Sequence, residues 1–458
     1  MTQHYDAAII GTGQAGPSLA DRLSKAGMKL AVIERGRFGG TCVNTGCMPT
    51  KTLVASAYAA RIAARASEYG VTIGGPIGID MKKVKARKDA VAGTASGNVE
   101  KWLRSMPGTT IYQGHARLLS PNDIAIGETR ISAERIFINV GGRAVVPPIL
   151  GLQTVPYLTN ETVMEIDFVP RRLVVLGGSY IGLEFAQIFR RFGSEVVVIE
   201  AAPKLVPRED DDVSDAIKDI LEVEGIDVRL STRCTEVTME DRCPRLHLLS
   251  PTGSDHADGT HILLAIGRRP NTDDLGLEAA GVAVEKNGTI VTDEALRTNV
   301  ASIWAIGDCN GRGAFTHTAY NDFEIVAANL LDNDPRRVSD RILTYGLFID
   351  PPLGRVGMTE REARASSRPV LIGKRPMTRV GRAVEKGETQ GFMKILVDGQ
   401  THKVLGAAIL GTSGDEAVQC ITAIMSAGVP YTVLQRTVLI HPTVSELIPT
   451  VLGSLAPI

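Results

Sequence analysis

The 458-residue sequence contains no long apolar run, and no apolar leader precedes its first predicted strand. A membrane-spanning helix needs about 18 or more consecutive apolar residues, and a secretory leader needs a shorter apolar core. The residues from Met1 to Asp6 instead lead directly into a strand. We therefore expect a cytoplasmic protein without a membrane partner.

An excess of charge of one sign is also missing, because 50 Lys and Arg residues almost balance 51 Asp and Glu residues. Proteins that bind nucleic acids or anionic lipids electrostatically present a broad basic surface. The composition therefore argues against a nucleic-acid partner and favours small molecules as partners.

Cysteine is scarce, since six cysteines in so long a chain do not make the disulfide framework of a secreted protein. Cytosolic disulfides are usually catalytic or redox-sensing, and Cys42 and Cys47 lie only five residues apart. A structural zinc site would need further Cys or His ligands at short spacing, so we predict no metal site here. The other cysteines are predicted to be ordinary thiols: Cys234, Cys243, Cys309 and Cys420.

Glycine, in contrast, is abundant, with 47 residues and no repeats or low-complexity segments. The glycines cluster where predicted strands turn into helices, which is typical of an α/β chain whose backbone approaches ligands closely. The chain length allows about three domains.

A first nucleotide-binding unit is predicted at the N-terminus, with a strand at 5–10, a helix to Ala26 and a strand at 28–34. The turn between strand and helix carries the glycines Gly11, Gly13 and Gly16. Such glycines let the backbone approach a pyrophosphate at the helix N-terminus. Glu34, twenty-three residues after Gly11, is placed to accept hydrogen bonds from a ribose.

The same pattern returns with a strand at 172–176, a helix to Arg191 and a strand at 195–200. Its turn carries the glycines Gly177, Gly178 and Gly182. Ser179 replaces the middle glycine, and Glu200 again follows the first glycine by twenty-three residues. Two such units predict two dinucleotides, the arrangement needed to pass a hydride from nicotinamide to flavin.

The end of the second unit bears on the choice of coenzyme. Glu200 would repel a 2′-phosphate, and residues 201–203 contain no arginine. Lys204 and Arg208 remain alternative phosphate partners. The sequence thus slightly favours NADH over NADPH.

The segment from Gly39 to Lys51 resembles the active-site motif of the flavoprotein disulfide reductases, the class I pyridine nucleotide-disulfide oxidoreductases. Lipoamide dehydrogenases, glutathione reductases and mercuric reductases belong to this family. In a regular helix, residues five apart lie about 140° apart, so the two cysteines would not meet on one face. Gly46 and its neighbours predict an irregular first turn, and Pro49 is expected to open the following helix.

The resemblance implies FAD and NAD(P)H as cofactors. It makes Cys42 the thiol that attacks substrate and Cys47 the sulfur that faces the flavin. Lys51 would lie near the reactive flavin nitrogen and pair with Glu184. Further cofactor-binding residues are expected from the motif and from segments 138–143, 264–270 and 303–308: Gly40, Thr41, Gly141, Gly267 and Asp308.

Residues 439–446 resemble the C-terminal signature of the same family. There His441 would be the general acid and base, and Glu446 would orient it. In the family this histidine reaches the disulfide of the other subunit, so the resemblance implies a homodimer with composite active sites.

The motif order predicts an α/β fold with two Rossmann-like dinucleotide-binding domains and a C-terminal α+β dimerisation domain. The FAD-binding domain is expected to be discontinuous and to take residues 1–147 and 263–337. Residues 148–262 would form the NAD(P)-binding domain. Residues 338–458 would form the dimerisation domain.

The electron acceptor is left open between several candidates, of which a small disulfide ranks first. Dihydrolipoamide dehydrogenase ranks second, although that group usually has His-Ala-His where this chain has Leu439-Ile440-His441. Glutathione is disfavoured because Asp21 stands where glutathione reductases place an arginine. Reduction of a mercuric or copper ion ranks third, because no cysteine follows Glu446, whereas mercuric reductases carry a cysteine pair there. Thr50 and the stretch 351–360 are closer to a stress-response branch, whose members reduce metal ions or quinone-like acceptors as well as disulfides.

A hypothesis from another class and another enzymatic alternative also stay open. A redox sensor or electron-transfer flavoprotein would need no proton-handling pair, so His441 and Glu446 argue against it. Oxidase or transhydrogenase chemistry needs no second cysteine, so Cys47 argues against it.

Overall fold

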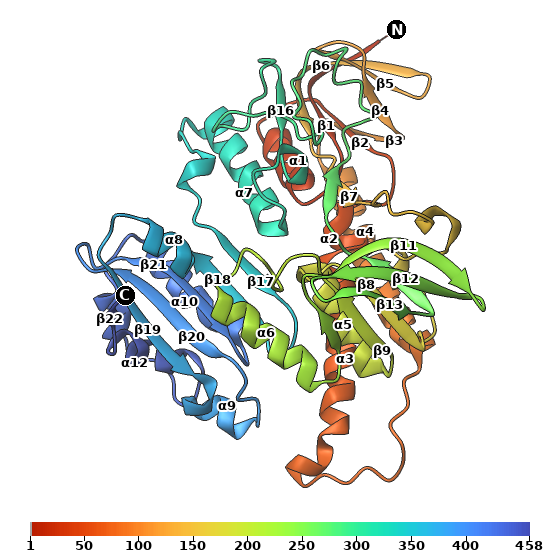
Figure 1. Cartoon of the computed structure of the whole chain (residues 1–458). Helices are drawn as coiled ribbons and strands as arrows, with labels where there is room; N and C mark the ends of the chain where they lie inside the picture. Colours follow the sequence, from red (N-terminus) through yellow and green to blue (C-terminus); the bar gives the residue numbers. More distant parts are fainter. Residues whose placement is uncertain (1) are drawn as a thin grey trace.

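The computed structural model describes residues 2–458, and three of its sheets form the centres of separate regions (Figure 1). Residue 1, with which the first predicted domain begins, lies outside the described residues. Helices and strands alternate through the first two regions, and the third is built on an antiparallel sheet. The predicted α/β fold class is thus confirmed.

The first sheet has the order β3-β2-β1-β6-β5-β4, with β16 paired to β6. Its strands are β1 (Gln3–Ile10), β2 (Leu30–Glu34), β3 (Thr109–Gln113), β4 (Ala116–Leu118), β5 (Asp123–Ile126), β6 (Thr129–Ile138) and β16 (Ile303–Ala305). The strands β3, β2, β1, β6 and β16 run parallel, and the end of β1 is buried on both faces. A short apolar run is typical of a strand that is covered on both faces.

Helices cover this sheet and connect it to the second region. The helices α1 (Ala15–Lys25) and α7 (Thr316–Ala327) lie side by side and share one core with β1 and β2 (Figure 1). The short α2 (Gly40–Asn44) precedes α3 (Cys47–Ala64), which packs against α4 (Met81–Ser105) and against α5 (Tyr180–Phe192) of the second region.

The second region centres on a parallel sheet of order β10-β9-β8-β14. Its elements are β8 (Arg172–Leu176), α5 (Tyr180–Phe192), β9 (Glu195–Ile199), α6 (Asp211–Val223), β10 (Asp227–Arg229) and β14 (His261–Leu264). A three-stranded antiparallel sheet packs on it, made of β11 (Arg233–Glu240), β12 (Cys243–Ser250) and β13 (Gly253–Asp258). The strands β7 (Gly142–Ala144) and β15 (Arg268–Pro270) pair between the first two regions.

The third region is a six-stranded sheet of order β17-β18-β21-β20-β19-β22. Its strands are β17 (Thr344–Leu347), β18 (Leu353–Gly357), β19 (Val370–Pro376), β20 (Phe392–Asp398), β21 (Val404–Leu410) and β22 (Ala456–Pro457). Its helices are α8 (Glu360–Ala365), α9 (Gly381–Glu385), α10 (Gly414–Ser426), α11 (Thr432–Gln435) and α12 (Ile448–Leu452). Within the described part of the chain, no helix has the length and apolarity that a membrane crossing requires.

Some element ends differ from the sequence prediction. The strand β2 begins at Leu30 rather than at residue 28, because the Met28 amide donates to the Leu23 carbonyl oxygen in the turn after α1. The strand β14 crosses the predicted domain boundary at 263, since its pairing with β8 continues to Leu264.

Candidate functional site

A cavity of about 710 Å³ runs along the carboxyl ends of the first sheet to the two cysteines. Its walls include the residues that follow β1, β2, β3, β6 and β16. Open parallel sheets bind ligands at this edge, and a volume of several hundred Å³ is typical of a ligand site. The cavity is therefore the candidate nucleotide site.

The first glycine turn is packed closely against the end of β6. A Cβ atom at Gly11 would lie 2.3 Å from the carbonyl oxygen of Asn139, and one at Gly16 would lie 2.5 Å from the Gly11 oxygen. The Asn139 side chain donates to the carbonyl oxygens of Gly11 and Gly13. A Cβ atom at Gly40 would lie 2.6 Å from the Gly13 Cα, so the start of α2 touches the same turn.

Glu34 and Glu200 occupy equivalent positions in the two units. The Glu34 carboxylate accepts hydrogen bonds from the amide and hydroxyl of Thr12, at 2.9 and 2.6 Å. The Glu200 carboxylate accepts from the amides of Gly178 and Ala202, at 2.6 and 2.7 Å. Each nucleotide unit thus holds a carboxylate in a fixed position at the end of its second strand.

The second glycine turn is as tight as the first. A Cβ atom at Gly177 would lie 2.4 Å from the Ala265 oxygen, and one at Gly182 would lie 2.1 Å from the Gly177 oxygen. Ser179 precedes α5, whose residues Tyr180 and Glu184 line the cavity. The second unit therefore meets the cavity through the first turns of α5.

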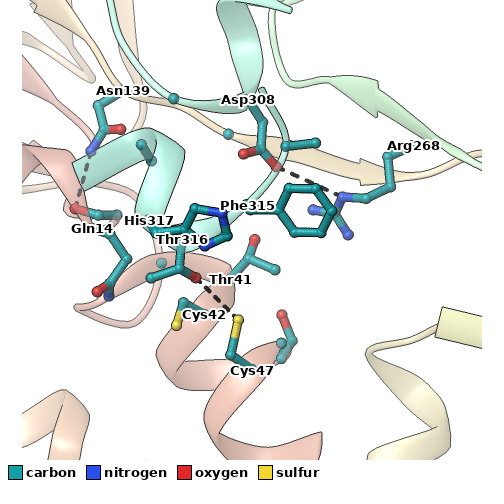
Figure 2. A pocket seen from close by; sticks show the side chains of 18 of the residues that line it. Gln14, Thr41, Cys42, Cys47, Asn139, Arg268, Asp308, Phe315, Thr316 and His317 are labelled. Carbon is teal, nitrogen blue, oxygen red and sulfur yellow. Dashed lines mark hydrogen bonds and ion pairs between the residues drawn. The ribbon is translucent and has the colours of Figure 1, made fainter. Parts of the chain in front are cut away.

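The remaining predicted cofactor residues are Thr41, Gly141, Asp308 and Gly267. Thr41, Gly141 and Asp308 line the cavity, and burial raises the pKa of the Asp308 carboxyl. The Asp308 carboxylate lies 3.9 Å from the Arg268 guanidinium (Figure 2). Gly267 lies just before β15 with a φ of 143°, which favours glycine.

Cys42 and Cys47 lie on two different helices, α2 and α3, and both are free thiols. The helix is broken at Thr45 and Gly46, where a Cβ atom on Gly46 would lie 2.8 Å from the Thr41 oxygen. The prediction that Pro49 opens the helix is wrong, because α3 begins at Cys47. Proline is tolerated in the first helical turn, where amides have no intrahelical acceptor.

The two neighbouring thiols influence each other's ionisation, and this separates their pKa values. The Cys42 thiol lowers the pKa of Cys47 to about 6, with further help from Thr316 and the Lys51 charge. The Thr316 hydroxyl oxygen lies 3.1 Å from the Cys47 sulfur (Figure 2). The Cys47 thiol and burial raise the pKa of Cys42. In the reduced pair, Cys47 therefore carries the negative charge and Cys42 holds the proton.

We expect the Cys47 thiolate of the reduced protein to persist at neutral pH and to be lost as pH falls through about 6. The rate of iodoacetamide alkylation at Cys47, followed by mass spectrometry, should rise through this pH and then level off. Cys47→Ser is the control that removes the signal. A midpoint above pH 8 would contradict the expected stabilisation of the thiolate.

Lys51 and Glu184 form an ion pair at the end of the cavity, although they are far apart in the sequence. The Lys51 ammonium lies 2.7 Å from Glu184 and 4.5 Å from the centre of the Phe348 ring. The second oxygen of Glu184 accepts from the Phe348 amide at 3.0 Å. Both oxygens of the carboxylate are thus held, and the lysine charge is fixed beside Cys47.

His441 and Glu446 pair with each other away from these cysteines. The Glu446 carboxylate lies 2.8 Å from Nδ1 of His441, whose side chain is 81% exposed. The preceding Val438 and Ile440 are 97% and 80% exposed. Within residues 2–458, this pair is not among the residues that line the cavity. The single chain therefore brings four of the six predicted catalytic residues together and leaves the histidine pair on the surface.

Sequence reasoning missed an aromatic group beside the cysteines. The Phe315 ring stacks on the rings of His317 and Tyr345, with centroids 5.4 and 5.7 Å apart, and Tyr180 meets two of these rings edge-on. Arg355 of β18 also lines this part of the cavity. No local motif marks these residues, because they meet only through tertiary packing.

Among the described residues, no group of three or more His, Cys, Asp or Glu side chains is placed to hold a metal ion.

Comparison with protein families gives two matches that together span most of the chain. Residues 5–322 match the pyridine nucleotide-disulphide oxidoreductase model. Residues 344–452 match the dimerisation domain of the same group.

Individual relatives carry three different names. The chain is 36% identical to the probable pyridine nucleotide-disulfide oxidoreductase RclA of Escherichia coli, over 96% of this chain and 97% of that protein. It is 32% identical to a dihydrolipoyl dehydrogenase of Chlamydia muridarum, over 97% and 96%. It is 33% identical to a mercuric reductase of Streptomyces lividans, over 94% and 92%.

Solved structures agree with these matches. The HOCl-induced flavoprotein disulfide reductase RclA from Escherichia coli superposes with a TM-score of 0.90 at 35% identity, over 98% of this chain and 100% of that chain. A Cu(II) complex of the same protein gives a TM-score of 0.89 at 35% identity, over 98% and 99%. By sequence and by fold, the chain belongs to the pyridine nucleotide-disulphide oxidoreductase family, whose members use FAD and a pyridine nucleotide.

Proposed function

We propose that this flavoprotein passes electrons from NAD(P)H through FAD to the Cys42–Cys47 pair and on to a small disulfide. The observation that carries the proposal is the thiol pair at the end of the nucleotide cavity, beside the Lys51–Glu184 ion pair. A pair of thiols with separated pKa values is suited to disulfide exchange, because one sulfur attacks and the other is stabilised as thiolate.

The residues of the cavity fit FAD. The glycine turn at the start of α1 suits a pyrophosphate, because amides at a helix N-terminus attract anions. Glu34 offers carboxylate oxygens at the end of β2, where a ribose is expected. Asp308 is a buried carboxyl that would gain from hydroxyl donors such as those of the ribityl chain.

When bound, FAD accepts a hydride from the coenzyme and transfers two electrons to the disulfide. Cys42 then attacks one sulfur of the acceptor, forming a mixed disulfide and releasing the first thiol. Cys47 attacks the Cys42 sulfur, which closes the internal disulfide and releases the second thiol. His441 takes the proton from Cys42 and gives it to the first leaving sulfur, and a second proton, taken from solvent, goes to the second leaving sulfur. Glu446 holds the imidazole in place.

An anaerobic titration of the purified holoprotein with NADH tests this route. We expect a long-wavelength absorption band, because the Cys47 thiolate would lie against the oxidised flavin after two-electron reduction. Cys47→Ser should lose the band, whereas Cys243→Ser, a change in β12, should keep it. Simple bleaching of the wild-type flavin without the band would contradict the coupling of the cysteines to the flavin.

NADH is the proposed coenzyme, and Glu200 is the residue that supports it. Its carboxylate is fixed by two backbone amides where a 2′-phosphate would lie. The alternative phosphate partner Lys204 is held at 2.6 Å by the Glu209 carbonyl oxygen and at 2.7 Å by Asp211. The fixed carboxylate therefore disfavours NADPH.

Glu200→Gln should reduce the preference for NADH over NADPH by roughly 10-fold, because a like charge beside the phosphate is removed. The ratio of the two kcat/KM values measures it. Glu195→Gln, at the exposed start of the same strand, is the matched control and should leave the ratio unchanged. A wild-type protein that prefers NADPH would contradict the assignment.

A homodimer is proposed from the match of residues 344–452 to the dimerisation domain and from the exposed segment around His441. His441 of one chain would serve the cysteines of the other.

We place the FAD-binding domain at 1–147 and 265–337, with the NAD(P)-binding domain between them, because β14 belongs to the second sheet up to Leu264. Residues 338–458 form the proposed dimerisation domain.

Reduction of a metal ion at the same thiol pair is a second candidate. The likeness to RclA, which has been solved as a Cu(II) complex, favours it, and thiolates are preferred ligands of Cu(I). NADH oxidation should then proceed with Cu(II) as acceptor and yield two Cu(I) for each NADH, measured with a Cu(I) chelator. Equal rates for the wild type and Cys42→Ser would reject this candidate.

A further inference from the structure

Arg355 is a buried charge for which the proposed reaction has no use. It lies on β18, directly opposite Tyr345 of β17, and its side chain is 1% exposed. It lines the nucleotide cavity, yet within the described residues none of its guanidinium nitrogens has a hydrogen-bond partner. A buried guanidinium without partners is costly, so this position favours an anionic ligand.

The carboxylates beside Arg355 are only weakly engaged with it. Glu209 and Asp210 approach the guanidinium at 3.9 and 4.0 Å, which is too long for a hydrogen bond. Asp210 is already bound by the Lys394 ammonium at 2.9 Å and by the Glu360 amide. The Arg355 charge is therefore balanced mainly by Glu209.

Glu209 is itself an unusual counter-ion. Its side chain is fully buried, one oxygen accepts a hydrogen bond from the Tyr345 hydroxyl, and the other has no partner among the described residues. Burial raises the pKa of this carboxyl, which means that its negative charge is poorly stabilised. The Arg355 guanidinium can thus still bind an anionic ligand.

The position of Arg355 indicates which ligand would bring that anion. The rings of Tyr180, Phe315 and Tyr345 lie against one another with centroids 5.7 to 5.9 Å apart. Tyr180 begins α5 and stands one turn before Glu184, so both face the same side of the helix. This wall therefore connects the second glycine turn, which starts α5, with the Lys51–Glu184 pair.

We infer that Arg355 binds the 5′-phosphate of the nicotinamide half of the coenzyme, beside the aromatic wall of Tyr180, Phe315 and Tyr345. The third region would thereby contribute a binding residue to the coenzyme site. Guanidinium groups suit phosphate because their donors match its oxygens in pairs. The inference rests on the family's use of a pyridine nucleotide, not on the proposed acceptor.

Equilibrium binding to the oxidised holoprotein, measured by calorimetry, tests the inference without turnover. The probes are NAD⁺, nicotinamide mononucleotide and nicotinamide riboside, of which only the riboside lacks the phosphate. Arg355→Gln should raise the Kd of NAD⁺ and of the mononucleotide by roughly 10-fold to 100-fold and leave the riboside unchanged. Arg355→Lys, which keeps the charge but loses the paired donors, should raise the same Kd values by a smaller factor.

Glu209→Gln provides the opposite test in the same place. It keeps the acceptor for the Tyr345 hydroxyl and removes the charge that competes with phosphate, so the Kd of NAD⁺ should fall several-fold. Lys374→Gln is the matched control, because Lys374 pairs with Asp212 across the same junction between regions and lies on the surface. It should leave every Kd unchanged.

Opposite changes in affinity for the Arg355 and Glu209 variants support the inference. A lower melting temperature for both variants with unchanged Kd values would show that the pair only ties two regions together, and would overturn it. An equal loss of riboside and mononucleotide binding would also overturn it, because the phosphate would not be the group recognised. If Arg355→Gln fails to fold, the Arg355→Lys and Glu209→Gln results still decide whether Arg355 binds the phosphate. Failure of the disulfide route would show separately, as a missing long-wavelength band in the NADH titration.

Discussion

Cys42→Ser is expected to lose disulfide turnover by on the order of 1,000-fold or more while NADH still reduces the flavin. A serine hydroxyl is a poor nucleophile at neutral pH, and no second sulfur remains to close the disulfide with Cys47. The variant should be tested with a small aromatic disulfide as acceptor, with turnover and flavin reduction measured on the same preparation. The placement of Cys42 beside Cys47, whose pKa it lowers, is the structural basis of this expectation.

The matched control is Cys243→Ser, because Cys243 is a half-buried thiol of β12 outside the site. It should keep full turnover. Unchanged turnover in Cys42→Ser would show that Cys42 takes no part in the reaction. That result would favour the electron-transfer hypothesis instead. Loss of flavin reduction in the same variant would instead point to a damaged cofactor site.

The two nucleotide units could be predicted from the sequence because their signals are local. Each unit is a short apolar strand, a glycine turn and a helix, and the last glycine of each turn is required by a contact within that turn. At Gly16 and Gly182, a Cβ atom would collide with the carbonyl oxygen of the first glycine of its own turn. Such a collision depends on a few consecutive residues, so the sequence pattern already contains it.

The site is predictable only in part, because its contacts join distant segments. Lys51 and Glu184 are 133 residues apart, and only the family resemblance suggested their pairing. Thr316 is 269 residues from Cys47 and carries no motif of its own, yet it contacts the sulfur whose pKa is lowered. In the sequence, Arg355 was visible only as one residue of the stretch 351–360. Its burial without partners follows from the packing of three regions, which no local pattern records.

His441→Gln is the second change with a large expected effect, a loss of about 100-fold to 10,000-fold in disulfide turnover. Its imidazole is held by Glu446 but points to solvent in the single chain, 81% exposed. The rate of flavin reduction by NADH should stay unchanged, because that step needs no proton from this group. Thr437→Ala, an exposed change in the same segment, serves as the control and should keep turnover.

A hybrid dimer decides whether His441 acts on its own chain or on its partner. Co-expressed, differently tagged chains carrying Cys42→Ser and His441→Gln can be purified as the mixed dimer. If the histidine acts across the interface, one site combines both changes and the other has an intact cysteine pair and an intact histidine. The mixed dimer should then show about half of the wild-type turnover, although both parent dimers are nearly inactive. If the histidine acts within its own chain, each site carries one change, and the mixed dimer stays as inactive as its parents. That second outcome would require the segment around His441 to move from the surface to the cysteines of its own chain.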